Sequence, residues 1–372
     1  MKKKQKKKAW LCACIAAVCV SMIVFNIVYN LLMKRSEPRM EKRCRRIKKK
    51  IDSEIENIKS PEGKVSEKHL KYLRRTLSKV KNLMAFHRVY QTDSAQDVQT
   101  YLEYMRQIRP AIMYLAVKYE DKEVMQASYF TYFLSCCTSD REASIDTLQD
   151  ILLDYVKKPN LYCRFNAMNA MYRFAAPEYI VKAVKIQDDG EVFFHEKLLT
   201  EGLLTYYGDH DKLIGALLEQ FGSFSSHTQL AILNYIRFCS GNYKEQMFKI
   251  LSDESQDKEL RISSVRYFGK YRYEQARQCL LSFVRDKSAD KWEYATVAAS
   301  SLAKYPGADT ESALKEALHS SNWYVRFSAS QSLSELGVDY SDVIDIVAGN
   351  DRYAREMMMY RLELRKLEEA EV

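Results

Sequence analysis

The segment WYVRFSASQSL, residues 323–333, decides the fold of this chain. Val325, Ala329 and Leu333 recur at intervals of four residues, so in a helix they lie on one face. Ala329 is small, and a small residue in the middle of an apolar face lets a second helix approach closely. The segment therefore predicts a helix that packs against a neighbour along a narrow apolar seam.

The same pattern recurs upstream at a nearly constant interval. Its copies begin at Cys163, Glu196, Thr228, Leu260, Tyr294 and Val325. Successive starts are separated by 33, 32, 32, 34 and 31 residues. This period is long enough for two helices and two short turns, and a single helix pair cannot bury its apolar face alone. The repeat predicts a stack of antiparallel helix pairs.

Glycine and proline usage supports an all-helical chain. Only 11 Gly and 6 Pro occur among 372 residues, and these residues supply the bends of tight turns. Sandwiches, barrels and doubly wound α/β folds need many such turns and are therefore not expected. We expect an all-α protein, and several of its few breaks, such as Pro306-Gly307, fall between the helices of the repeat.

The repeat resembles the HEAT repeats of bacterial proteins, in particular the HEAT-like repeats of phycobilisome lyases, over about residues 160–350. Arg164, Arg261 and Arg326 stand where such repeats often carry arginine. The resemblance implies that each arginine pairs with an acidic residue and ties neighbouring repeats together. Lys197, Gln229 and Ala295 stand at this position in the other copies, so such a ladder would be interrupted. Direct contact of the arginines with a partner is the alternative.

The N-terminal 50 residues carry most of the positive charge. They hold a net charge of +14 within a chain of +9, so the remainder is mildly acidic, which argues against nucleic-acid binding. Residues 9–33 contain no charged side chain, and basic residues flank them. This pattern predicts an uncleaved single-pass transmembrane helix, with Trp10 and Tyr29 as anchors at the membrane interface.

Charges on both sides of this span do not decide its orientation. Unpaired cysteines favour a reducing compartment, so we expect a body in the cytoplasm beneath the cell membrane. Within the span, Ala13, Ala17 and Ser21 recur every four residues, which permits a homodimer through close helix contact.

These observations divide the chain into six regions. They are a basic tail (1–8), the transmembrane helix (9–33), a basic helical stem (34–63), a helical connecting or capping region (64–122), the HEAT-like repeats (123–349) and a C-terminal capping helix (350–372).

No motif for catalysis or cofactor binding is visible. The glycines form no phosphate-binding loop, and no two of the six histidines stand three or four residues apart, as a metal-binding helix would need. We therefore expect no catalytic residue, no cofactor and no metal site, and not an enzyme.

The sequence points instead to a membrane-anchored scaffold that holds a protein partner. Trp323 and Tyr324, at the start of a repeat, are candidates for partner contact or for packing between repeats. The family resemblance implies a role as an adaptor, for example for a glycosyltransferase or another envelope-biosynthesis complex. The alternative is an enzyme or cofactor-handling protein with a lyase-like activity.

Overall fold

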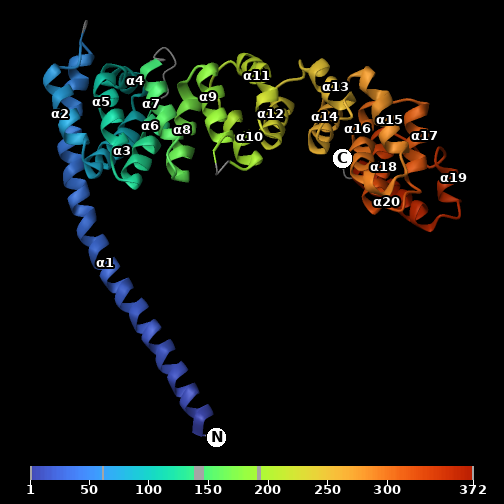
Figure 1. Cartoon of the computed structure of the whole chain (residues 1–372), viewed down its shortest axis with the longest axis horizontal. Helices are drawn as coiled ribbons and strands as arrows, with labels where there is room; N and C mark the ends of the chain where they lie inside the picture. Colours follow the sequence, from blue (N-terminus) through green and yellow to red (C-terminus); the bar gives the residue numbers. More distant parts are fainter. Residues whose placement is uncertain (1, 61–62, 138–145, 191–193, 371–372) are drawn as a thin grey trace. The chain divides into compact units, whose positions relative to one another are not determined.

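The computed structural model describes residues 2–60, 63–137, 146–190 and 194–370, and within these ranges the chain is helical and contains no strand (Figure 1). The expected all-α class is therefore confirmed. The chain forms two compact units, residues 1–179 and 180–372.

Unit 1 begins with a helix of 57 residues, and shorter helices follow it. In chain order its helices are α1 (Lys2–Ile58), α2 (Glu67–Leu77), α3 (Val80–Ser94), α4 (Val98–Gln107), α5 (Arg109–Glu120), α6 (Val124–Cys137), α7 (Asp146–Val156) and α8 (Leu161–Phe174). α3 and α4 pack against the C-terminal part of α1, and α6 packs against α8. Ile47, Ile51 and Ile55 are buried in the first of these contacts, as their helical spacing suggests.

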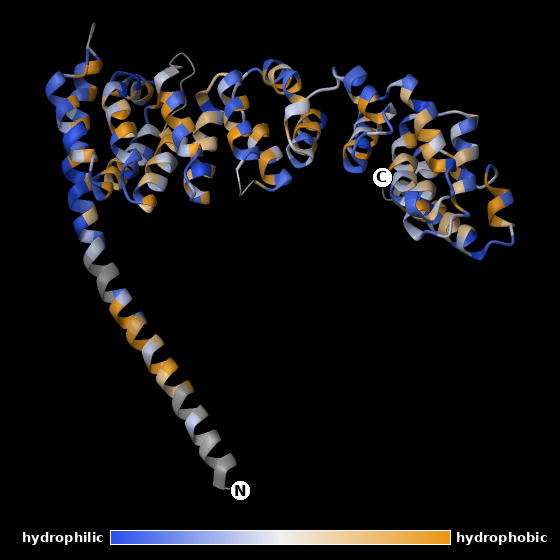
Figure 2. Ribbon diagram, in the orientation of Figure 1, coloured by the Kyte–Doolittle hydropathy of each residue, from blue (hydrophilic) through white to orange (hydrophobic). Residues whose placement is uncertain are grey.

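The predicted transmembrane helix is wrong. No helix within the described residues is long and apolar enough to cross a membrane. Figure 2 shows hydrophobic residues of α1 between positions 15 and 30. Side chains of residues 11–14 and 31–33 lie outside those described.

Three predictions depended on that span. Localisation in the cell membrane is corrected with it. Trp10 and Tyr29 are both exposed on α1. Their predicted role as anchors at a membrane interface is withdrawn, because it depended on the span. The predicted dimer face includes Ala13, whose side chain lies outside those described, and Ser21, whose hydroxyl donates to the carbonyl of Val18 in its own helix at 2.7 Å.

Unit 2 follows from within α9, whose first residues still belong to unit 1. Its helices are α9 (Pro177–Asp188), α10 (Glu196–Leu204), α11 (His210–Glu219), α12 (Ser226–Cys239), α13 (Lys244–Ser252), α14 (Lys258–Lys270), α15 (Arg277–Arg285), α16 (Trp292–Ser301), α17 (Ala308–Ala317), α18 (Trp323–Glu335), α19 (Ile344–Val347) and α20 (Arg352–Ala370).

The repeated sequence pattern lies in one layer of unit 2. α10, α12, α14, α16, α18 and α20 pack successively against one another. Val325, Ala329 and Leu333 of α18 are all buried, and Tyr294, Ala298 and Leu302 are their buried counterparts in the α16 repeat. The small residue at the centre of each face therefore lies where neighbouring helices meet.

Each helix of the second layer packs on the pattern-bearing helix that follows it in the chain. α13 packs on α14, α15 on α16, and α17 on α18. The structural unit is thus a second-layer helix followed by a pattern-bearing helix. The sequence pattern alone suggested the opposite order within each repeat.

Hydroxyl groups link successive pattern-bearing helices. Ser332 of α18 donates to the carbonyl of Ala299 in α16 at 2.8 Å, and Ser301 of α16 donates to that of Val265 in α14 at 3.0 Å. Thr200 of α10 donates to the carbonyl of Ala231 in α12 at 3.1 Å. Each group is buried, so the bond satisfies a hydroxyl that would otherwise lose its water.

Candidate functional site: an aromatic patch on unit 2

Four aromatic side chains from α16 and α18 form a continuous cluster, which we call the aromatic patch: Trp292, Trp323, Tyr324 and Phe327. The rings of Trp292 and Tyr324 stack with centroids 5.6 Å apart, which joins neighbouring repeats. Trp323 stacks on Phe327 at 5.0 Å and meets Tyr324 edge-on at 5.3 Å. These separations are those of favourable aromatic pairs.

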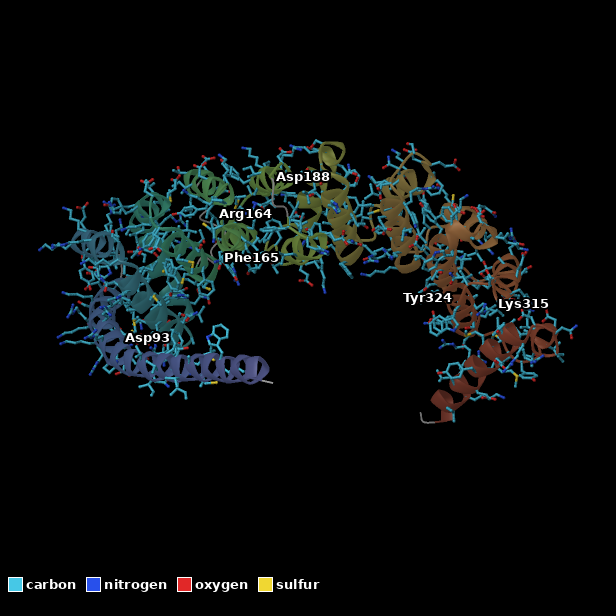
Figure 3. All side chains as sticks on the ribbon, turned by 60° about the horizontal axis from the view of Figure 1, so that its bottom comes forward. Asp93, Arg164, Phe165, Asp188, Lys315 and Tyr324 are labelled. Carbon is cyan, nitrogen blue, oxygen red and sulfur yellow. The ribbon has the colours of Figure 1, made fainter. Side chains whose placement is uncertain are left out.

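The aromatic patch faces solvent although it is large and apolar. Trp323 is 50% exposed and Tyr324 is 56% exposed, and Tyr324 projects from α18 at the surface of unit 2 (Figure 3). Asn322 caps α18, because its side chain accepts a hydrogen bond from the backbone N–H of Tyr324 at 2.8 Å. The cap fixes the first turn of the helix and so holds both rings in place.

A groove of about 570 Å³ adjoins the patch. Trp292 lines it together with residues from the ends of α15 and α17, including Val284, Glu316, His319 and Asn322. Lys287 and Glu316 form an ion pair at 2.7 Å in this region, and the hydrogen bond from Lys287 lowers the pKa of Glu316. An apolar wall beside a small number of placed polar groups is typical of recognition surfaces.

The family resemblance implied that the arginines of the pattern pair with acidic side chains, but Arg326 and Arg261 donate to backbone carbonyls. Arg326 donates through Nη1 to the carbonyls of Ser320 at 2.6 Å and Ser321 at 3.1 Å, and lies over the ring of Tyr353 at 5.2 Å. These two carbonyls follow the C-terminal end of α17. Their position explains the choice of partner, since free carbonyls there attract a cation as an acidic side chain would.

Arg261 repeats this arrangement two repeats earlier, in α14. It donates through Nε to the carbonyl of Leu251 in α13 at 3.1 Å. Its guanidinium lies 5.4 Å from the ring centroid of Phe283 and 5.5 Å from that of Tyr294. Arg261 therefore joins the end of α13 to aromatic rings of the next repeat.

Sequence reasoning missed a third member of this series. Arg355 in α20 donates to the carbonyl of Gly349 at 2.9 Å, after the end of α19. It stands one residue after buried Ala354, as Arg326 stands one residue after buried Val325. The pattern at 354, 358 and 362 could have revealed it, but its start lies only 29 residues after Val325.

Arg164 is the exception among the predicted arginines. It belongs to α8 of unit 1, where it is 6% exposed, and burial lowers its pKa. Phe165 follows it on the same helix (Figure 3). The structure thus brings Arg261, Arg326, Trp323 and Tyr324 into one unit and places Arg164 in the other.

A cysteine and a histidine approach each other elsewhere in unit 2. Cys239 Sγ lies 3.7 Å from His210 Nδ1, and the same nitrogen is 2.6 Å from the Tyr235 hydroxyl. Burial raises the pKa of the Cys239 thiol, which disfavours the reactive thiolate. Over the described ranges, no group of three or more His, Cys, Asp or Glu side chains could hold a metal ion.

A family model for HEAT repeats matches residues 245–334, which supports a HEAT-repeat protein. The match runs from α13 to α18, so it covers the pairs α13–α14, α15–α16 and α17–α18 and much of the aromatic patch. No curated protein matches the chain.

Proposed function

We propose that the chain is a protein-interaction scaffold whose unit 2 binds a partner through the aromatic patch. The observation that carries the proposal is the exposure of Trp323 and Tyr324, whose rings meet edge-on beside a groove. HEAT repeats generally mediate protein–protein interaction, and the match to such repeats covers this surface.

The chemistry of the patch favours a partner with apolar anchor residues. Trp and Tyr offer a large contact area and lose little conformational freedom on binding, so they are enriched among residues that dominate binding energy. The adjoining groove carries charges of both signs, with Lys287 paired to Glu316. We therefore expect recognition by shape and apolar contact more than by net charge.

The proposal assigns no reaction to the chain. Burial raises the pKa of the thiols of Cys44, Cys137, Cys163 and Cys239, which disfavours at these four positions the thiolate that would attach a chromophore. A visible absorption band on the purified chain would contradict this. The glycosyltransferase partner was implied by the family resemblance, and its placement at a membrane depended on the span corrected above; neither is part of the proposal.

Partner capture with matched variants tests the scaffold. The full chain, the double variant W323A/Y324A and the control Y207A are compared for the proteins that they retain. Tyr207 is 68% exposed in unit 2 and lies outside the patch. We expect the wild type and Y207A to retain the same partner, and W323A/Y324A to lose it by at least about tenfold in affinity. Equal retention by all three would refute the proposal.

A further inference from the structure

Three cationic side chains and one exposed ring gather toward the C-terminal ends of α12 and α14, and we call them the basic cluster: Arg237, Phe238, Arg266 and Lys270. Phe238 is 51% exposed. The Arg237 guanidinium lies 4.8 Å from the centroid of this ring, and Lys270 Nζ lies 5.9 Å from it. Arg266 and Lys270 stand four residues apart in α14, so they lie on one face of that helix. The basic cluster therefore spans two neighbouring repeats.

None of the three cations has an acidic partner among the residues that the structure describes. Lys270 Nζ donates to the backbone carbonyls of Arg237 and Phe238, at 3.1 and 3.3 Å. The Nε of Arg237 is buried, and no described group accepts a hydrogen bond from it. The side chain of Arg266 is exposed and has neither an ion pair nor a hydrogen bond within the described chain.

The helices around the basic cluster carry few acidic residues, and those lie elsewhere. α12 contains no Asp or Glu, and the acidic residues of α14 and α16, Glu259 and Glu293, stand in the first turns of those helices. Two acidic residues on adjoining segments are already engaged. Asp211 accepts a hydrogen bond from the Tyr243 hydroxyl at 3.1 Å, and Glu274 forms ion pairs with two other arginines.

This arrangement works against the stability of the folded chain. Burial lowers the pKa of Arg237, and the like charge of Arg266 lowers it further. Arg237 and Lys270 stand in the last turns of their helices, where the helix dipole favours a cation. That explanation does not extend to Arg266, which stands earlier in α14. Features that cost stability are tolerated where function needs them.

The chemistry of the basic cluster fits an acidic protein segment. Guanidinium groups bind carboxylates through paired hydrogen bonds, and clusters of arginine recognise acidic motifs. Phe238 adds an apolar contact beside them. Nucleic acid fits less well, because the chain beyond residue 50 is mildly acidic. Arg237 and Lys270 also compete with a nucleobase for the face of the Phe238 ring.

We propose that the basic cluster binds an acidic segment of a partner protein, with carboxylates against Arg237 and Arg266 and an apolar side chain against Phe238. The basic cluster shares no residue with the aromatic patch. Unit 2 then has two surfaces of different chemistry, and the basic cluster can be tested independently of the aromatic patch.

Hydrogen exchange followed by mass spectrometry on the full chain tests the proposal, with the capped synthetic peptide EEFEE as probe. The measurement is resolved along the chain because the basic N-terminal 50 residues also attract this peptide. We expect EEFEE to slow exchange in the C-terminal halves of α12 and α14. In R266Q/K270Q the same protection should need about tenfold more peptide. The control K212Q/K249Q removes two exposed cations from α11 and α13 and should behave as the wild type. No protection in the wild type, or equal protection in R266Q/K270Q, would overturn the proposal.

The single variant R266Q separates binding from folding. It removes no hydrogen bond or ion pair within the described chain and relieves the repulsion of Arg237. The free energy of unfolding of unit 2 should therefore stay unchanged or rise, whereas the affinity for EEFEE should fall about fivefold. A loss of stability in denaturant titration would instead assign Arg266 a structural role and contradict the proposal.

Two further comparisons identify the ligand and separate this surface from the aromatic patch. A thymidine oligonucleotide with the same charge as EEFEE should protect α12 and α14 less than the peptide does, and so should inorganic phosphate. Equal protection by either would overturn the choice of an acidic protein segment. W323A/Y324A should bind EEFEE as the wild type does. Loss of the captured partner in that variant, with peptide protection retained, concerns the aromatic patch alone.

Discussion

The two units hold their helices together by different means. Unit 2 uses the same device repeatedly, a buried hydroxyl that donates to a carbonyl of the neighbouring helix, as Ser301 and Ser332 do. Unit 1 uses individual aromatic contacts. Tyr104 lies 2.8 Å from His69 Nε2, and Tyr119 and Tyr155 donate to the carbonyls of Leu77 and Ala116, both at 2.7 Å.

This difference has consequences for stability. Repeated links between nearest neighbours make the stability of a solenoid approximately a sum of similar terms. Contacts of a tyrosine hydroxyl also occur in unit 2, where Tyr235 lies 2.6 Å from His210 and Tyr305 donates to the carbonyl of Phe268 at 3.2 Å. The feature that recurs from repeat to repeat in unit 2 is therefore the serine or threonine link. The match to HEAT repeats, which lies wholly within unit 2, follows the same division.

The largest expected effect comes from truncating one core ring in each unit. Phe268 in α14 and Phe133 in α6 are both fully buried. Removing a buried Phe ring loses apolar burial and leaves a cavity, so F268A and F133A should each cost about 3–5 kcal/mol. Hydrogen exchange followed by mass spectrometry, in denaturant, reports the loss separately for each unit.

The comparison of units predicts how far each loss spreads. F268A should lower protection in α12, α14 and α16, which pack on one another, and leave α3 and α6 unchanged. F133A should lower protection in unit 1 alone. Equal loss throughout the chain for either variant would show that the units do not unfold separately.

A smaller effect is expected from the arginine series. R326M keeps the length of the side chain but removes the donors to the carbonyls of Ser320 and Ser321. Water partly replaces these bonds, so the free energy of unfolding of unit 2 should fall by about 1–2 kcal/mol. Denaturant titration measures the change. R285M, at an exposed position of α15, is the control and should have little effect; an equal loss there would exclude a specific role for Arg326.

Sequence reasoning predicted the repeated part of the fold because its signal is local. A helix face with residues four apart and a small residue at its centre is visible in one chain, and recurrence at 31–34 residues multiplies the signal. The partner of each arginine was not predictable in this way. Whether Arg326 meets a carboxylate or a carbonyl depends on where α17 ends in space, which the spacing does not encode.

Two other outcomes show the same limit. The sequence predicts that Tyr353 and Tyr360 belong to a final polar helix. It does not show which apolar residues of that helix are exposed and which are buried. Trp323 and Tyr324 left two interpretations open, inter-repeat packing and partner contact. The structure places Tyr324 against Trp292 of the preceding repeat and also leaves it 56% exposed, so the two interpretations do not exclude each other.

The smallest effect expected from this comparison is a pH dependence confined to unit 1. Burial lowers the pKa of His69 and of His87; for His69 the nearby Glu54 opposes this shift and Lys50 adds to it. The folded state therefore favours neutral imidazoles, whereas in the unfolded chain these groups protonate below about pH 6.5. As the pH falls through that value, the unfolded chain binds protons that unit 1 does not, so stability is lost by up to about 1.4 kcal/mol per pH unit for each histidine, until the folded pKa is reached. Hydrogen exchange between about pH 7.5 and pH 5.5 should show this loss in α2 and α3, and H69Q and H87Q should each reduce its slope. A slope unchanged in both variants would mean that other groups carry the pH dependence of unit 1.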